Sequence, residues 1–280
     1  MIDKTREIEQ YVYEAGCDDV GTFGGKFEGG IQAQQIPDEI APCINAILES
    51  GEMTKHYLEI GVAAGGTTRI MHHFLKFDQI VLIDDNQHPK AHIRPYILDG
   101  IKHIEIIGTS LAQGTINKLK SLNLMFDVIF IDADHSYLGI SRDVKLYREF
   151  LRPGGFLILH DTLLPEWGPI YVTAELKKDK EMKFLGEYAT KKPMKQLGVT
   201  LFQKKNTDDG RKKDIGSVKN RIEGFCDCKL PLPYGRGFKR NMQNTIIHTH
   251  LFGMRYAHPQ LSNILGGIQL TRKCYGTVII

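Results

Sequence analysis

The sequence has few cysteines and no long apolar run, and both absences narrow the class of protein. No apolar segment approaches the roughly 20 residues that a membrane-spanning helix needs, so we expect no membrane partner. The first residues, MIDKTREIEQYVYEAG, are charged and lack the apolar core of a secretory signal peptide, which favours a cytoplasmic protein. The five cysteines are odd in number and widely scattered, so we expect reduced thiols rather than a disulfide framework.

Zinc-finger spacing is also missing. Beyond residue 206 the chain holds Cys226, Cys228 and Cys274 with three histidines, but no C-x₂-C pair has a partner at finger spacing, so we interpret these as free side chains. The stretch YGRGFKRN (234–241) mixes basic and aromatic residues, as RNA-binding surfaces do. A solvated surface is the commoner origin of such a run, and we favour it here.

The residues that are present describe an ordinary globular chain. Hydrophobic residues make up 42% and charged residues 25% of 280 residues, enough to bury one sizeable core and a smaller second unit. The net charge of +3 conceals an asymmetry, because residues 206–280 carry 12 Lys/Arg against 5 Asp/Glu and the remainder carries 24 against 28. A basic C-terminal segment therefore follows a mildly acidic body.

Short apolar runs recur in the body about every 24 residues. The five runs are Tyr57–Ile60, Ile80–Ile83, Ile104–Ile107, Val128–Ile131 and Phe156–Leu159. They are rich in β-branched residues and do not alternate, as expected of parallel strands that are covered on both faces. Segments that can form helices separate them, so the pattern predicts an α/β fold with a doubly wound sheet.

The clearest helix signal is the apolar stripe of Tyr137, Ile140, Val144, Tyr147 and Leu151. We expect the LRPGG stretch, 151–155, to stop this helix. A helix over 170–180 and two late strands, 183–188 and 198–203, complete the predicted seven-stranded sheet.

The chain is predicted to have three parts. Residues 1–56 form an N-terminal helical cap with a Gly-rich interruption, and residues 57–205 form the sheet core. The polar stretch after Lys204 marks the boundary with a basic C-terminal extension, 206–280, whose fold the sequence does not reveal.

The loop after the first strand has the features of a nucleotide cradle. In LEIGVAAGGTT, Gly61 and Gly65 permit a sharp turn and a close ligand approach, and the following helix N-terminus offers unpaired N–H groups. The G-x-x-x-G spacing differs from the G-x-G-x-x-G of dinucleotide binders. Asp84, at the end of the second strand, can accept hydrogen bonds from both ribose hydroxyls. The alternatives are glycines kept for packing and an aspartate that caps a turn.

These motifs, followed by FDVIFIDADH and LRPGG, resemble those of the class I S-adenosylmethionine-dependent methyltransferases over about residues 30–205. The resemblance implies a Rossmann-like fold with a reversed seventh strand, and S-adenosylmethionine as cofactor. It places Gly61 and Gly65 at the methionine end, Asp84 at the ribose and Gly108–Ser110 beside the adenine. The implied cofactor-binding residues are Glu59, Gly61, Ala63, Gly65, Thr67, Asp84, Gly108, Thr109, Ser110 and Asp132.

Two carboxylates are expected to meet beside this cradle. In the implied fold the fourth and fifth strands are neighbours, so Asp132 and Asp161 emerge at the same edge of the sheet. They would repel each other unless protonated or bridged by a cation, and an oxygen-rich site favours Mg²⁺ over Mn²⁺ or Ca²⁺.

The same residues resemble the metal-dependent sugar and antibiotic O-methyltransferases, among them the macrocin, mycinamicin and cephalosporin-biosynthesis enzymes. Asp132 and His135 match their Asp-x-x-His pattern, and Asp161 matches one of their acid pair, whereas His160 replaces the other acid. We therefore predict that Asp132 and Asp161 bind the metal and that His135 is the catalytic base. His160, Asp134 or water are candidates to complete the ligand set.

Other readings of these residues remain open. Asp134 is a candidate N-cap for the following helix, and His135 is a candidate cap or solvated side chain. Strand alternation points His160 to the face opposite Asp161, which favours a packed histidine. Trp167 and Tyr171 are candidates for the acceptor pocket or for ordinary core packing.

Three functions follow. The first is a Mg²⁺-dependent O-methyltransferase that acts on a hydroxylated small molecule, a sugar or a secondary-metabolite scaffold. The second is a nucleic-acid methyltransferase that uses the basic extension. Methylation of a base amino group is disfavoured, because the fourth strand ends in DADH and lacks the Asn/Asp-Pro-Pro-aromatic motif that binds such a group. The third is a non-catalytic protein that retains the fold for binding. The N-terminal helices are a candidate interface of a homo-oligomer.

Overall fold

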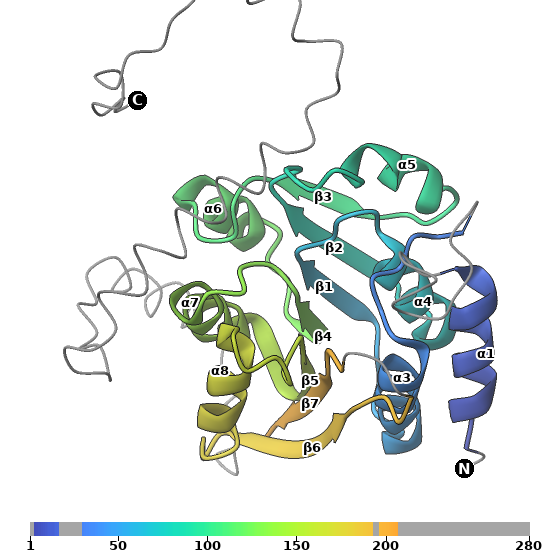
Figure 1. The fold of residues 1–280 in the computed structure, drawn as a ribbon. Helices are drawn as coiled ribbons and strands as arrows, with labels where there is room; N and C mark the ends of the chain where they lie inside the picture. The colour runs from blue at the N-terminus through green and yellow to red at the C-terminus, as the bar shows by residue number, and fades with distance from the viewer. Residues whose placement is uncertain (1–2, 17–29, 193–195, 207–280) are drawn as a thin grey trace, which may run out of the picture. The chain divides into compact units, whose positions relative to one another are not determined.

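A sheet of seven strands lies at the centre of the computed structural model, which describes residues 3–16, 30–192 and 196–206 (Figure 1). In chain order the strands are β1 (His56–Ile60), β2 (Gln79–Asp84), β3 (Ile104–Ile107), β4 (Phe126–Ile131), β5 (Leu151–His160), β6 (Met182–Tyr188) and β7 (Val199–Lys204). They lie in the order β3-β2-β1-β4-β5-β7-β6. Strands β1 to β5 are parallel, and β7 runs antiparallel to both of its neighbours. The predicted doubly wound sheet with a reversed late strand is confirmed.

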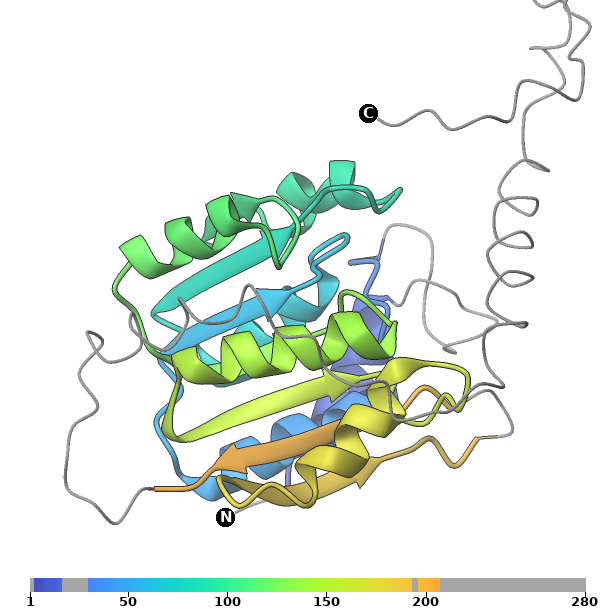
Figure 2. The ribbon, with the colours of Figure 1, turned by 90° about the vertical axis from the view of Figure 1, so that its left-hand side faces the viewer.

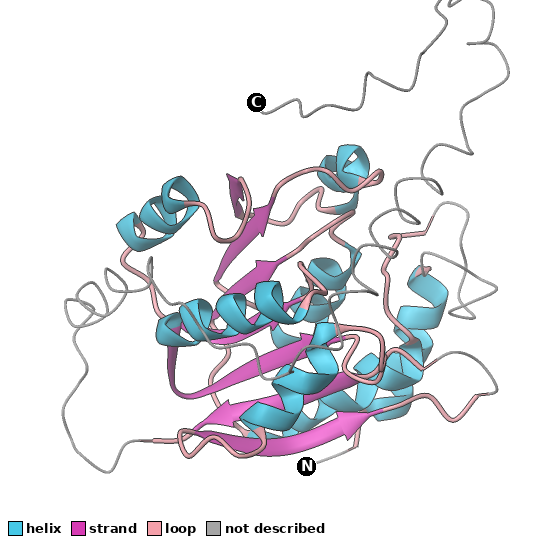
Figure 3. Ribbon diagram, turned by 60° about the vertical axis from the view of Figure 1, so that its left-hand side comes forward, coloured by secondary structure: helices cyan, strands magenta, loops and turns pink. Residues whose placement is uncertain are grey.

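Helices cover both faces of the sheet. In chain order they are α1 (Thr5–Ala15), α3 (Pro37–Ser50), α4 (Gly66–Leu75), η1 (Ala91–Ile93), α5 (Arg94–Ile97), α6 (Gln113–Ser121), α7 (Tyr137–Tyr147), η2 (Arg148–Phe150) and α8 (Gly168–Leu176). Helices α1, α3 and α4 pack on one face, and α6, α7 and α8 pack on the other (Figures 1 and 2). Coloured by element type, the strands form one layer between two layers of helices (Figure 3).

The apolar runs explain why the sheet is buried on both sides. Successive strand residues point to opposite faces, so Tyr57 packs in the cluster with α1, α3 and α4 whereas Leu58 packs in the cluster with α6, α7 and α8. Every residue of β4 is buried. The predicted stripe of α7 is also buried at Ile140, Val144 and Tyr147.

One local prediction, that of the N-cap of α7, is wrong. The LRPGG stretch does end the helical segment, because α7 ends at Tyr147, η2 covers Arg148–Phe150 and LRPGG opens β5. Its register with β4 jumps at this point, and such an irregularity tolerates Pro153, which has no N–H to donate. The N-cap of α7 is Ser136, whose hydroxyl accepts a hydrogen bond from Gly139 N (3.0 Å). Asp134 instead accepts a hydrogen bond from Ser136 N (2.8 Å) and precedes the cap.

Several predictions fall outside the described residues. These are most of the Gly-rich interruption and, apart from residue 206, the whole basic extension with its cysteines, histidines and YGRGFKRN stretch. Cys43, which is described, is a buried free thiol. Among the described residues, no helix combines the length and the apolar character needed to cross a bilayer.

Candidate active site

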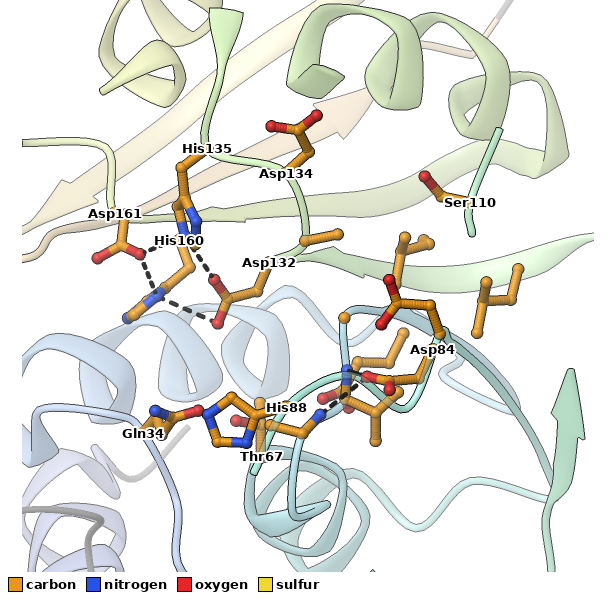
Figure 4. Close-up of a pocket in the computed structure, with 18 of the residues that line it drawn as sticks. Gln34, Thr67, Asp84, His88, Ser110, Asp132, Asp134, His135, His160 and Asp161 are labelled. Carbon is orange, nitrogen blue, oxygen red and sulfur yellow. Dashed lines mark hydrogen bonds and ion pairs between the residues drawn. The ribbon is translucent and has the colours of Figure 1, made fainter. Parts of the chain in front are cut away.

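A cavity of about 710 Å³ opens at the carboxyl ends of the parallel strands (Figure 4). Its wall includes all the predicted site residues except Gly65: Glu59, Gly61, Ala63, Thr67, Asp84, Gly108, Thr109, Ser110, Asp132, His135 and Asp161. These residues follow β1, β2, β3, β4 and β5, so strands distant in sequence build one site. Carboxyl-edge crevices of this kind are the usual ligand sites of open α/β sheets.

The glycine loop after β1 has a left-handed backbone at Gly61 (φ 82°), Ala63 (φ 48°) and Gly65 (φ 87°). A Cβ atom on Gly61 would lie 2.0 Å from the carbonyl oxygen of Asp132, so the end of β4 leaves no room for a side chain. Gly65 caps the N-terminus of α4. The packing interpretation therefore accounts for Gly61, although the same residue also lines the cavity.

Asp84 holds this loop in place. Its Oδ2 accepts hydrogen bonds from Val62 N (2.7 Å) and Ala63 N (3.0 Å), and its Oδ1 lies 3.0 Å from Arg94 Nη2. Burial raises the pKa of the carboxyl, but the backbone donors and the Arg94 guanidinium outweigh it, so the net pKa is lowered. Its predicted ribose contact would have to share oxygens that already bind the loop. The neighbouring Asp85 is exposed and also lines the cavity.

Glu59 is buried beneath the same loop, with 1% of its surface exposed. Its Oε2 accepts hydrogen bonds from the hydroxyls of Tyr57 (2.7 Å) and Thr68 (2.5 Å). Burial raises the pKa of the carboxyl to about 8 despite these donors. Glu59 therefore joins β1 to α4 as well as forming part of the cavity wall.

The loop after β3 forms another part of the cavity wall, and its Gly108 has φ 151°. Helix α7 supports this loop, because the Tyr147 hydroxyl donates to the carbonyl of Ser110 (2.6 Å). Asp143, one helical turn before Tyr147, is fully buried near the Ser110 side chain. Among the described residues, no hydrogen bond of ordinary geometry reaches its carboxylate oxygens.

The acidic corner contains two imidazoles between two carboxylates (Figure 4). His135 Nε2 lies 2.8 Å from Asp161 Oδ2 and 3.4 Å from Asp132 Oδ1. His160 Nδ1 lies 3.2 Å from Asp132 Oδ2 and 3.3 Å from Asp161 Oδ2. The two aspartates thus emerge at one edge of β4 and β5, as the sequence predicts.

The charges of this corner stabilise one another. Burial lowers the pKa of His135, but Asp132 and Asp161 outweigh it and raise the pKa to about 9. Burial alone would lower the pKa of His160, but the same two carboxylates together outweigh it, so the net pKa is raised. Burial raises the pKa of each aspartate, but the imidazoles bring the net value below the ordinary range.

The prediction that His160 points away from Asp161 is wrong. Strand β5 ends at His160, and Asp161 adopts a left-handed backbone with φ 58°. Strand alternation therefore no longer holds between residues 160 and 161, and both side chains line the cavity. There His160 contacts Asp132.

Sequence reasoning missed Gln34 and His88, which project into the cavity beside Thr67 (Figure 4). His88 belongs to no recognisable motif, and only the fold brings both side chains to the strand ends. Trp167 lines the cavity, and its ring centroid is 4.3 Å from that of His135. Tyr171 is half exposed and donates to the carbonyl of Pro165 (3.1 Å), which places it outside the cavity wall.

The donor set of the acidic corner fits a divalent cation. One ligand atom each from Asp132, His135 and Asp161 lies within 4.8 Å of the others. His135 Nε2 and His160 Nδ1 both face these carboxylates, and His160 Nε2 has no hydrogen-bond partner among the described residues. Carboxylate oxygens and imidazole nitrogens are groups that divalent metals bind in proteins.

Residues 58–162 match the sequence profile of a family described as a methyltransferase domain. This segment of the chain therefore resembles a methyltransferase domain in sequence. The matched segment runs from β1 to the end of β5 and includes every predicted site residue.

Several solved structures share the fold of this chain. A candidate O-methyltransferase from Klebsiella pneumoniae is 20% identical, with a TM-score of 0.50 over 73% of this chain and 89% of its own. The O-methyltransferase of tomaymycin synthesis from Streptomyces achromogenes, solved with S-adenosylmethionine, is 16% identical, with a TM-score of 0.50 over 71% and 90%. The Bacillus cereus O-methyltransferase, solved with S-adenosylhomocysteine, is 14% identical, with a TM-score of 0.50 over 73% and 92%.

An uncharacterized protein of Acanthamoeba polyphaga mimivirus is 26% identical over 119 residues, which is 40% of this chain. The matched region is 54% of that protein, so the chain spans about half the length of the curated relative it matches.

Proposed function

We propose that this methyltransferase transfers the methyl group of S-adenosylmethionine to a hydroxyl of a small molecule, a sugar or a secondary-metabolite scaffold. The observation that carries the proposal is the position of His135 Nε2, within 3.4 Å of both Asp132 and Asp161, in the cavity that also contains the glycine loop. The cavity of about 710 Å³ is within the range of roughly 300–1,000 Å³ for small-molecule sites. It has room for a nucleoside cofactor and a small acceptor.

The reaction needs a base because an alcohol is a poor nucleophile at neutral pH. The acceptor oxygen attacks the methyl carbon, a C–O bond forms as the S–C bond breaks, and the proton passes to His135 Nε2. The products are a methyl ether and neutral S-adenosylhomocysteine. A divalent cation held by Asp132 and Asp161, Mg²⁺ in the sequence-based prediction, would lower the pKa of the hydroxyl and orient it.

The charge of His135 supports a role for such a cation. Burial lowers the pKa of His135, but without a cation the Asp132 and Asp161 carboxylates outweigh it and raise the pKa to about 9, which favours the protonated imidazole. A second positive charge beside Asp132 and Asp161 would compete for the carboxylates and favour the neutral imidazole.

Formation of S-adenosylhomocysteine with a panel of hydroxylated acceptors tests the proposal. We expect His135→Ala to lower kcat by about 10²–10⁴, the usual contribution of a general base, and Asp161→Ala to lower it comparably. His92→Ala is the matched control, because His92 is exposed and lies outside the cavity wall. Retained binding of S-adenosylhomocysteine shows that each variant is folded. Near-wild-type turnover of both His135→Ala and Asp161→Ala would end the proposal.

The same assay separates the alternatives. Methyl transfer to RNA, but to no small acceptor, would favour a nucleic-acid methyltransferase. Cofactor binding without turnover of any acceptor would favour a binding protein.

A further inference from the structure

His160 is a buried imidazole, 4% exposed, whose Nδ1 faces two carboxylates in the cavity. Its Nε2 has no hydrogen-bond partner among the described residues. Buried polar atoms in proteins are nearly always paired, so Nδ1 with two carboxylate oxygens around it marks a polar cluster within the core. Its Nδ1 is 3.2 Å from Asp132 Oδ2 and 3.3 Å from Asp161 Oδ2.

These separations match the spacing of donor atoms around one metal ion. Bonds of about 2.1 Å to nitrogen and oxygen put neighbouring donors about 3.0 Å apart at right angles and about 3.4 Å apart in a tetrahedron. The two nitrogen–oxygen separations at His160 Nδ1 are 3.2 Å to Asp132 and 3.3 Å to Asp161.

We propose that His160 Nδ1 is a metal ligand beside Asp132 and Asp161, and that it makes the site selective for a first-row transition ion such as Mn²⁺ or Fe²⁺ over Mg²⁺. The inference deepens the proposed function and rests on its cation site. Imidazole nitrogen suits borderline ions such as iron and zinc, and Mn²⁺ accepts it alongside carboxylates. Mg²⁺ requires a nearly ideal octahedron, is usually bound through oxygen ligands, and gives up its waters reluctantly.

The charge of the donor set agrees with this assignment. Two carboxylates and a neutral imidazole carry a charge of −2, which one divalent ion neutralises. A third carboxylate at position 160 would leave the buried site with an excess negative charge, which is costly away from water. The nitrogen ligand therefore changes the preferred metal without reducing the number of donors.

Binding of Mn²⁺ to the chelator-treated full-length protein tests the inference without measuring turnover. We expect titration calorimetry to show Mn²⁺ bound at least about tenfold more tightly than Mg²⁺. Electron spin-echo spectra of bound Mn²⁺ should show modulation from a directly coordinated ¹⁴N nucleus. His160→Gln should abolish this modulation, whereas His135→Gln should retain it, which separates the two imidazoles. The matched control His92→Gln should behave as the wild type.

A reciprocal variant makes the test sharper. His160→Asp supplies a third carboxylate, so we expect the preference for Mn²⁺ over Mg²⁺ to fall at least about tenfold. Binding of S-adenosylhomocysteine verifies the fold of each variant, and the wild-type spectrum does not depend on any variant.

Three results would overturn the inference: a wild-type spectrum without nitrogen modulation, Mg²⁺ bound as tightly as Mn²⁺, or no binding of either ion. Methyl transfer that proceeds with no bound metal would refute this inference while leaving the methyltransferase activity in place. Mn²⁺ binding through His160 in a protein that methylates no hydroxyl would support this inference and refute the proposed O-methyl transfer.

Discussion

Replacing Asp143 with asparagine should change how the stability of this protein depends on pH. Asp143 is fully buried, and among the described residues no hydrogen bond of ordinary geometry reaches its oxygens, although the Ser110 side chain lies near enough to act on its charge. Burial raises its pKa to about 7 from 3.8, the nearby Asp134 carboxylate adds to the rise, and the Ser110 hydroxyl opposes it. The folded chain therefore holds this proton more tightly than the unfolded chain does.

The sign and size of the effect follow from proton linkage. A carboxyl whose pKa is raised by folding lowers the free energy of unfolding as the pH rises above the pKa of the unfolded state. This loss of stability is complete once the pH exceeds the pKa of the folded state. Between pH 5 and pH 8 the free energy of unfolding of the wild type should fall by about 2–3 kcal/mol relative to that of Asp143→Asn, because the variant has no proton to release at this position. With a typical urea dependence, this corresponds to a shift of about 1 M in the denaturation midpoint.

Urea denaturation at several pH values between 5 and 8 measures the difference. Tyr147→Phe is the matched control, because Tyr147 lies one turn along the same face of α7 and contacts the same loop. It removes one hydrogen bond to Ser110, so it should cost about 1 kcal/mol at every pH. A stability difference between wild type and Asp143→Asn that stays constant with pH, or that grows in favour of the wild type, would refute the reasoning.

Three further variants test the supports of the cavity. Gly61→Ala introduces a Cβ at φ 82°, 2.0 Å from the Asp132 carbonyl oxygen, and should lower stability by about 2–4 kcal/mol; an unchanged melting temperature would contradict the packing argument. Arg94→Met leaves the largely buried Asp84 carboxylate without its guanidinium and should cost about 3 kcal/mol in urea denaturation, whereas a neutral effect would show that the backbone donors suffice. Ser136→Ala removes the N-cap of α7 and should cost about 1 kcal/mol, and thermal melting that matches the wild type would show that the cap is dispensable.

The strands could be predicted because their signal is local. Each parallel strand is buried on both faces, so its burial appears directly as a short apolar run such as 128–131. The meeting of Asp132 and Asp161 also follows from the sequence once the strands are placed, because parallel neighbours end at one edge. Their roles, and that of His135 as base, remain predictions.

The errors occur where one backbone angle or one bulge changes direction. No residue pattern reveals that Asp161 has φ 58°, yet this angle breaks the strand alternation and leaves Asp161 Oδ2 3.3 Å from His160 Nδ1. The irregular register at the start of β5 likewise accommodates Pro153 inside a strand. Asp134 is the predicted N-cap of α7, but Ser136 occupies that position. The sequence does not distinguish the two residues, because both can accept the same kind of hydrogen bond.

The sequence by itself determined the sheet, its two helical layers and the acidic residues at its edge, because hydrophobic periodicity and strand ends are properties of neighbouring residues. Only the tertiary structure decided which side chains share the cavity. Gln34 and His88 come from separate loops, and both line the cavity because of how those loops pack. The imidazole of His160 faces the carboxylates for the same reason: a contact between distant segments is a property of the folded chain as a whole.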